Sequence, residues 1–85
     1  MKEFDYVITD ELGLHARPAG QLVKAASACP CAVRLTANGQ TVDAKRVMGV
    51  MRLAVKKGGM LTVTCEGEGE EAAAETLRAF LTANL

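Results

Sequence analysis

The sequence of 85 residues contains no tryptophan, one tyrosine and two phenylalanines, so the aromatic side chains that stack on nucleic-acid bases are nearly absent. It also lacks any apolar run close to the ~20 residues of a membrane-spanning helix, and we expect no membrane insertion. Four acids occupy the first eleven positions, where a secretion signal has an apolar segment, so we do not expect the protein to be secreted. Ten basic residues balance ten acidic ones, which excludes a general polyanion binder acting through overall charge.

Cysteine is also scarce, and its odd count of three is a poor basis for a disulfide framework. Cys29, Cys31 and Cys65 could supply three zinc ligands, but no histidine lies near them in the sequence to complete the site. We therefore expect buried, reduced thiols, no metal and a cytoplasmic location, with a zinc site as the weaker alternative. The length predicts a single domain over residues 1–85.

The neutral total hides an uneven distribution of charge along the sequence. Residues 1–11 carry one base and four acids, residues 12–57 carry eight bases and one acid, and residues 58–85 carry one base and five acids. The basic middle segment indicates either a local anionic ligand or an acidic partner. A solvated surface with uneven charge is the simpler alternative.

The first third of the sequence has the pattern of a strand followed by a helix. Apolar and polar residues alternate over residues 4–8, which is typical of a half-buried strand. The chain then turns through Gly13. Apolar residues next recur at helical spacing, with Pro18 in the first turn, where its missing N–H costs nothing. This helix is expected to end near residues 29–30.

The middle of the sequence predicts a hairpin and a short helix. Residues 33–37 alternate as a strand, and Asn38-Gly39 is a strong hairpin signal because both residues tolerate positive φ. A short return strand at 41–42 and a helix over 46–53 follow.

The last third of the sequence predicts a strand over 61–65, after a break at Gly58-Gly59, and then a helix opened by Glu70. Its buried stripe is expected to comprise Ala73, Ala74, Leu77, Phe80 and Leu81. The order β-α-β-β-α-β-α predicts an α+β fold, an open-faced β-sandwich in which a four-stranded antiparallel sheet carries three helices on one face.

His15 is the only histidine, and it lies where the first loop meets the start of a helix, in the segment GLHARPA at 13–19. The unpaired N–H groups and positive end of a helix attract a phosphate and leave the imidazole neutral and nucleophilic. Arg17 adds donors that suit phosphoryl oxygens. These residues favour a histidine that accepts a phosphoryl group. A capping or loop histidine without chemistry is the open alternative.

The segment at 13–19 resembles the active-site signature of the HPr family, the histidine-containing phosphocarriers of the bacterial sugar phosphotransferase system. Residues 45–53 (KRVMGVMRL) resemble the short second helix of that family. The chain length, the Asn38-Gly39 hairpin and the break at Gly58 fall in register with the family. The resemblance covers essentially the whole chain.

The resemblance implies the chemistry of a carrier. Enzyme I, phosphorylated by phosphoenolpyruvate, would pass its phosphoryl group to the Nδ1 atom of His15, and the group would go on to the IIA component of a sugar permease. Arg17 would compensate charge during transfer. The implied phosphoryl-binding set is Ala16, Arg17 and Pro18, with the first two amides receiving the oxygens. A monomer without metal or cofactor, and without enzymatic turnover, is expected.

The resemblance also gives the second helix a docking role. Val47, Met48 and Met51 are expected to form an apolar patch beside His15, because flexible methionines suit several partners. Val50 and Leu53 are expected to be more buried, and a fully buried helix is the alternative. Basic residues are expected to rim the patch and to complement acidic partners: Arg17, Lys24, Lys45, Arg46 and Arg52.

Three positions depart from the family pattern. Arg46 stands where many Gram-positive members have a serine that an ATP-dependent kinase phosphorylates, so that switch is expected to be absent. Leu12 and Ala54 replace residues that are often polar or glycine. A paralogue that serves a nitrogen-regulatory or dihydroxyacetone branch, or that acts mainly by binding a regulator, is therefore the alternative. A nucleic-acid-binding domain that uses the basic middle segment is the weakest reading, and we expect no nucleic acid as partner.

Overall fold

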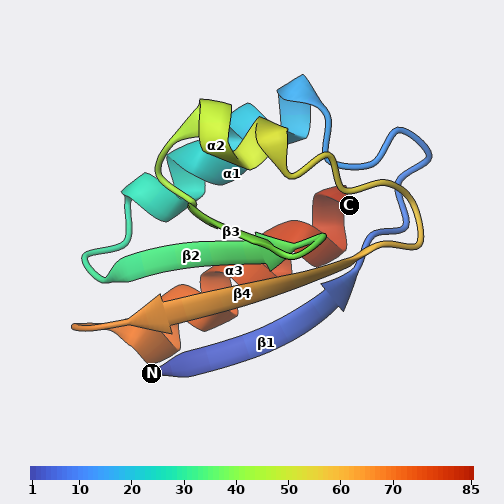
Figure 1. The fold of residues 1–85 in the computed structure, drawn as a ribbon. Coiled ribbons are helices and arrows are strands. Elements are labelled where there is room, and N and C mark those ends of the chain that lie inside the picture. The colour runs from blue at the N-terminus through green and yellow to red at the C-terminus, as the bar shows by residue number, and fades with distance from the viewer.

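The structure is a computed structural model that describes all residues from Met1 to Leu85. Seven elements follow one another along the chain (Figure 1): β1 (Lys2–Val7), α1 (Ala16–Ser27), β2 (Ala32–Ala37), β3 (Gln40–Asp43), α2 (Val47–Arg52), β4 (Met60–Glu66) and α3 (Glu70–Asn84). The predicted order of strands and helices is confirmed. None of the helices combines the length and the apolar character that crossing a membrane requires.

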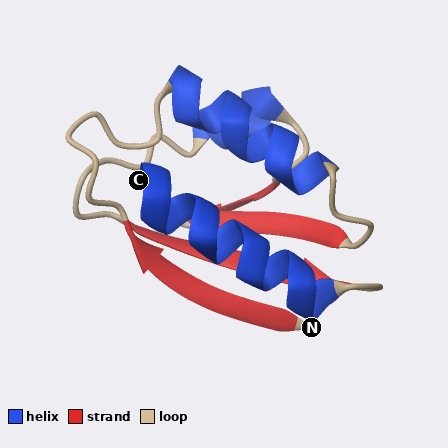
Figure 2. Ribbon diagram, turned by 180° about the vertical axis from the view of Figure 1, so that it is seen from behind, coloured by secondary structure: helices blue, strands red, loops and turns tan.

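The four strands form one antiparallel sheet in the order β1-β4-β2-β3. All three helices lie on the same side of this sheet, and the other side is open (Figure 2). α3 packs on β1 and β4, α2 lies next to β3, and α1 contacts both other helices. The predicted α+β fold, an open-faced sandwich, is therefore confirmed.

Strand register explains which side chains are buried. Phe4 lies opposite Val63, and Val63 lies opposite Leu35, so these three form a row on the side that the helices cover. Because side chains alternate along a strand, the neighbouring row faces the open side. That row is polar and consists of Glu3, Thr64, Arg34 and Asp43.

The core is one cluster of 23 buried apolar residues drawn from the sheet, the helices and the loops. Ile8 belongs to it although β1 ends at Val7. Phe80 was predicted to be in the buried stripe of α3, but it is only half-buried and packs against the edge of the core. Helical spacing places Phe80 one position away from the centre of the stripe, which Leu77 and Leu81 occupy with no exposed surface.

The hairpin between β2 and β3 turns at Asn38 and Gly39, which have φ angles of 52° and 76°. Both values are positive, as the sequence predicted. The Asn38 side chain also donates a 2.7 Å hydrogen bond to the carbonyl oxygen of Leu53. The hairpin therefore supports the end of α2.

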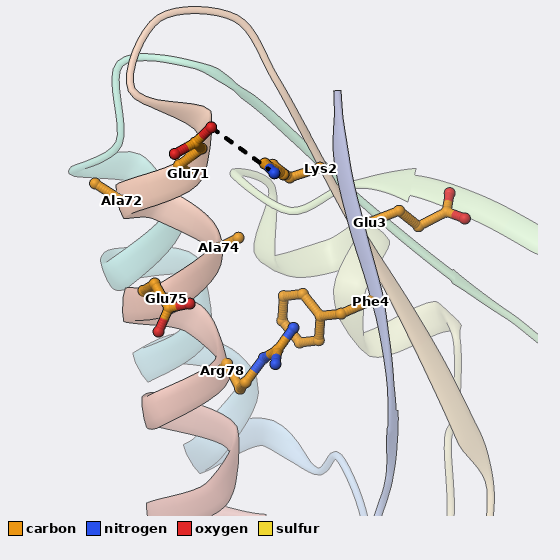
Figure 3. A pocket seen from close by; sticks show the side chains of 8 residues that line it. All are labelled: Lys2, Glu3, Phe4, Glu71, Ala72, Ala74, Glu75 and Arg78. Carbon is orange, nitrogen blue, oxygen red and sulfur yellow. Dashed lines mark ion pairs between the residues drawn. The ribbon is translucent and has the colours of Figure 1, made fainter.

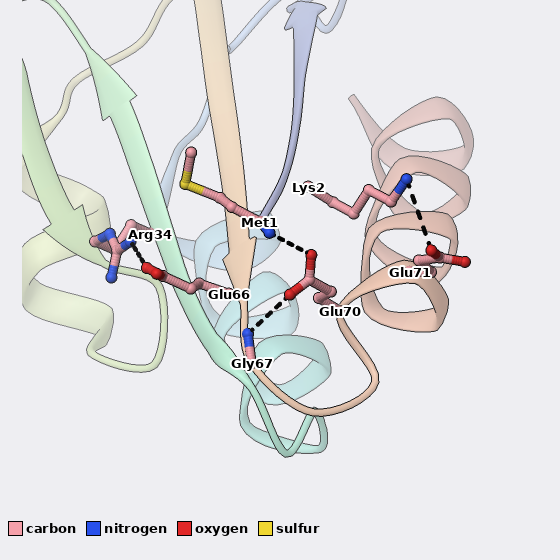
Figure 4. Close-up of polar contacts among 7 residues, drawn as sticks. All are labelled: Met1, Lys2, Arg34, Glu66, Gly67, Glu70 and Glu71. Atoms are coloured by element: carbon pink, nitrogen blue, oxygen red, sulfur yellow. Dashed lines mark hydrogen bonds and ion pairs between the residues drawn. The ribbon is translucent and has the colours of Figure 1, made fainter.

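The start of α3 is fixed by Glu70 (Figure 4). Its carboxylate accepts a hydrogen bond of 3.1 Å from the Gly67 amide and lies 2.6 Å from the Met1 amino group. The hydrogen bond from the amino group, followed by that from Gly67, lowers the pKa of the Glu70 carboxyl. Nearby, Arg34 pairs with Glu66 across the open side of the sheet at 2.7 Å.

Candidate functional site

His15 is the N-cap residue of α1 and has an extended backbone, with φ −91° and ψ −174°. Its carbonyl oxygen accepts the first helical hydrogen bond, from Ala19, while its side chain caps nothing. The preceding residue, Leu14, is buried and anchors the loop. His15 is half-exposed on this fixed base. The backbone of His15 is therefore held at a defined position, and its imidazole is open to solvent.

The first turn of α1 offers two free amide donors. The Ala16 and Arg17 amides donate to no backbone oxygen of the chain, since the helical bonds of this turn begin at Ala19. Pro18 has no N–H, and its side chain is buried in the first turn. No acidic residue occupies this turn. The partial positive charge of the helix end is therefore available to an anion beside His15.

Arg17 adds a full positive charge to the same position. It is exposed and belongs to none of the ion pairs in the structure. His15, Arg17 and Pro18 line one hollow of about 350 Å³. The first turn of α1 thus brings together an imidazole, a guanidinium and two free amides, a combination suited to a phosphoryl group.

Sequence reasoning did not find all the residues of this hollow. Its other walls are Asp10, Leu12, Gln21 and Asn84. The Asp10 carboxylate accepts a 2.8 Å hydrogen bond from the Leu12 amide, which gives it a structural role in the loop. Asn84 comes from the last turn of α3, and no local pattern links it to His15. The loop reaches α3 because the Asp10 amide and the Thr9 hydroxyl donate to the carbonyl oxygen of Leu85 at 3.0 and 2.8 Å.

The predicted docking residues on α2 form an apolar patch. Met48 is 65% exposed, Met51 40% and Val47 39%, whereas Val50 and Leu53 are buried. This division between exposed and buried residues is the one expected from the docking role that the resemblance implies. α2, which carries the patch, packs against α1, the helix that begins directly after His15 (Figure 1).

The basic residues expected on the rim of the patch differ in their surroundings. Lys24, Arg46 and Arg52 are exposed, with Arg46 3.9 Å from Asp43. Lys45 was expected on the rim of the patch, but its Nζ donates a 2.9 Å hydrogen bond to the carbonyl oxygen of Cys29. Since Cys29 follows the C-terminal end of α1, Lys45 connects α1 to the start of α2.

Comparison with known proteins identifies the family. The family model described as the PTS HPr component phosphorylation site matches residues 2–83. The chain is also 40% identical over 82 residues to the phosphocarrier protein HPr of Lysinibacillus sphaericus, covering 96% of this chain and 93% of the relative. The chain belongs to the HPr family. The resemblance inferred from residues 13–19 and 45–53 is therefore confirmed for the chain as a whole.

Solved structures of HPr proteins support the same conclusion. The histidine-containing phosphocarrier of Mycoplasma superposes with a TM-score of 0.93 at 33% identity, covering 96% of this chain and 93% of that chain. The Crh protein of Bacillus subtilis, a catabolite repression protein, superposes at 0.77 with 35% identity, covering 100% and 98%. Crh was solved as an intertwined dimer with a swapped domain. The monomeric state expected for this HPr-family chain therefore stays a prediction.

The HPr-family position that departs most from the expected pattern is the N-cap of α2. Arg46 occupies it with an extended backbone, φ −123° and ψ 111°, and its side chain caps no amide. A serine at such a position could accept a phosphoryl group and cap the helix, but Arg46 has no hydroxyl. The kinase-dependent switch that the family resemblance suggests for this position has no acceptor here.

The three thiols of this HPr-family protein are free and buried. Burial, with smaller contributions from Cys31 and Cys29, raises the pKa of the Cys65 thiol to about 11. Burial also raises the pKa of Cys29. The structure contains no group of three or more His, Cys, Asp or Glu side chains arranged to hold a metal ion.

Proposed function

We propose that this protein carries a phosphoryl group on His15 between Enzyme I and the IIA component of a sugar permease, in the cytoplasm. The observation that supports this best is the placement of His15 at the N-cap of α1, beside the free Ala16 and Arg17 amides. Family membership supplies the partners, and the exposed patch on α2 is the surface on which we expect them to dock.

The transfer follows from these groups. The imidazole Nδ1 of His15 attacks phosphorus, a new nitrogen–phosphorus bond forms, and the bond from phosphorus to the donor atom of Enzyme I breaks. The Ala16 and Arg17 amides and the Arg17 guanidinium receive the phosphoryl oxygens, where they stabilise negative charge during transfer. In the second step the IIA nucleophile attacks the same phosphorus and His15 leaves. No cofactor takes part, and the protein is unchanged after one cycle.

The primary test uses labelled phosphoenolpyruvate and Enzyme I. One acid-labile phosphoryl group per chain is expected on the wild-type protein, and none on His15→Ala. Folding of the variant is checked by circular dichroism. Labelling of a folded His15→Ala protein would show that another residue is the acceptor, and the absence of label on wild type with several bacterial Enzymes I would overturn the proposal.

A second test separates the chemistry at Arg17 from docking. Arg17→Gln is expected to lower the maximal transfer rate by about tenfold to a hundredfold, because it removes donors from the transferring phosphoryl group. Lys24→Gln removes another exposed base from the same helix and is expected to raise only the KM for Enzyme I. Equal effects of both substitutions on the maximal rate would contradict the role of Arg17.

The acceptor decides between the sugar branch and the paralogue alternatives. Labelled protein is mixed with IIA domains of sugar permeases, a IIA-like nitrogen-regulatory protein and dihydroxyacetone kinase subunits. We expect the labelled phosphoryl group to be transferred fastest to a sugar IIA domain. Faster transfer to either of the others would assign the protein to that branch.

A further inference from the structure

β1 is the strand with the longer free edge in the sheet. It pairs with β4 on one side only, over all six of its residues from Lys2 to Val7. The backbone groups on its other side are therefore unpaired within the sheet. Such an edge is a template for strand addition by another chain. α3 packs against β1 from the covered side.

A hollow of about 460 Å³ lies along this edge (Figure 3). The successive residues Glu3 and Phe4 both line it, although they point to opposite faces of the sheet. Figure 3 shows the Phe4 ring pointing toward α3 and the Glu3 side chain pointing away from it, so the hollow lies on the helix side of β1. Its far wall is α3, which contributes Ala74, Glu75 and Arg78.

The two sides of the edge differ in chemistry. On the open side, Glu3 and Asp5 are two residues apart and accept hydrogen bonds from Thr64 at 3.1 Å and Thr62 at 2.7 Å. These hydrogen bonds tie one oxygen of each carboxylate to β4, and neither carboxylate forms an ion pair. Between them, on the helix side, lies the Phe4 ring.

Phe4, Ala72 and Ala74 are the apolar residues of the hollow, and charged residues form the rest of its lining. The Phe4 ring lies beside Ala74, and the Arg78 guanidinium covers it 4.7 Å from the centroid. Lys2, the one base of β1, is 3.7 Å from Glu71 and so already has an acidic neighbour. A strand added at this edge would therefore meet acidic, apolar and acidic positions at Glu3, Phe4 and Asp5.

We propose that the edge of β1 binds an extended segment of another protein in which two basic residues flank an apolar one. Residues opposite each other in neighbouring strands share a face. The two basic side chains would thus lie opposite Glu3 and Asp5, while the apolar side chain would enter the hollow beside Phe4. This surface lies at the opposite edge of the sheet from β3, the strand beside α2.

A second copy of the chain fits this edge poorly. Antiparallel pairing of two β1 strands with their helices on the same side has its two longest registers centred on Phe4 and on Asp5. The first register places Glu3 opposite Asp5, and the second places Asp5 opposite Asp5. Each therefore brings two carboxylates together, which destabilises a strand pair. In this arrangement the acidic edge disfavours self-pairing and favours a basic partner.

The test measures binding of a nine-residue peptide with Lys-Val-Lys at its centre to the full chain by NMR titration. Chemical-shift changes and slower amide exchange are expected at β1, and a peptide with Glu-Val-Glu at its centre is expected to bind more than tenfold more weakly. Changes confined to β3 or to α1 and α2, or equal binding of the two peptides, would overturn the proposal.

Matched variants locate the contacts. Glu3→Gln and Asp5→Asn keep an acceptor for the threonines and are each expected to weaken binding of the basic peptide about twofold to fivefold. Asp43→Asn, on the opposite edge strand, is expected to leave it unchanged. Phosphorylation of His15 by Enzyme I serves as a separate readout that these variants should not alter. Dimerisation of the free protein through β1 in analytical ultracentrifugation would also overturn the proposal.

Discussion

The Leu14 amide donates a 2.8 Å hydrogen bond to the carbonyl oxygen of Val55. This bond joins the loop that carries His15 to the segment that follows α2. Gly13 makes the close approach possible, since its φ is 68° and a Cβ atom there would lie 2.4 Å from the Val55 oxygen. The position of His15 therefore depends on contact between two segments about forty residues apart in the sequence.

Gly13→Ala is expected to destabilise the protein by about 2–4 kcal/mol, because alanine adds both left-handed backbone strain and a clash with backbone. It is also expected to slow phosphorylation of His15 by displacing the loop. Urea denaturation and the labelling assay measure the two effects. Gly20→Ala is the control: its Cβ would meet nothing within 4 Å, and a gain of up to about 1 kcal/mol is expected. Equal stability of Gly13→Ala and wild type would contradict the close packing.

Ala54 has a φ of 49°, directly after the end of α2. Glycine is the usual residue in this left-handed position after a helix. Ala54→Gly is therefore expected to stabilise the protein by up to about 1 kcal/mol, as the relief of strain exceeds the entropy lost by glycine. Ala28→Gly, at the right-handed C-cap of α1, is expected to destabilise it instead. The two urea midpoints should move in opposite directions, and a fall for both would refute the strain at Ala54.

Most of the fold could be predicted because its signals are local. Alternation over 4–8 and 33–37 set the faces of two strands, and Asn38-Gly39 set the hairpin with positive φ at both residues. The left-handed backbone of Ala54 could not be predicted, since alanine carries no signal for it. It arises from the way the chain leaves α2 to reach Val55, which is buried.

The site could be predicted only in part, because local signals indicate some of its residues and not others. His15 and Arg17 are neighbours in the sequence, and the helix start beside them has its own signals. Asn84 joins their hollow only because α3 packs against α1 and the loop before α1 bonds to Leu85. Contacts of this kind depend on tertiary packing over about seventy residues of sequence, and no pattern near either partner indicates them.

The raised pKa of the buried Cys65 thiol predicts that the free energy of unfolding falls at alkaline pH. Burial raises the pKa of its thiol from 9.0 to about 11 in the folded protein. Between these values the unfolded chain has lost the proton and the folded chain still holds it, so stability falls as pH rises from about 9 to 11. Below this window both states hold the proton and the stabilisation is fully present.

The comparison with Cys65→Ala isolates this contribution from the lysines and the tyrosine, which also titrate at high pH. The variant is expected to be less stable than wild type at pH 8.5, because a small cavity replaces the sulfur. The difference in unfolding free energy is expected to narrow as pH approaches about 11. A difference that stays constant from pH 8.5 to 11 would refute the raised pKa.

Alkylation of the three thiols at pH 7.5 is expected only after unfolding, since buried thiols are inert.

Substitutions at two exposed methionines test whether Enzyme I recognises the surface of α2 or only the net charge of the protein. Met48 is 65% exposed on α2, and Met60 is 54% exposed on β4. Met60 points to the open side of the sheet, away from the helices, since its neighbour Leu61 is buried beneath them. Met48→Asp is expected to raise the KM for Enzyme I about tenfold with little change in kcat, because an apolar docking contact is lost and a charge repels an acidic partner. Met60→Asp adds the same charge at a similarly exposed position and is expected to leave both constants unchanged. A similar rise in KM for both variants would show that net charge, rather than contact at α2, determines the recognition of Enzyme I.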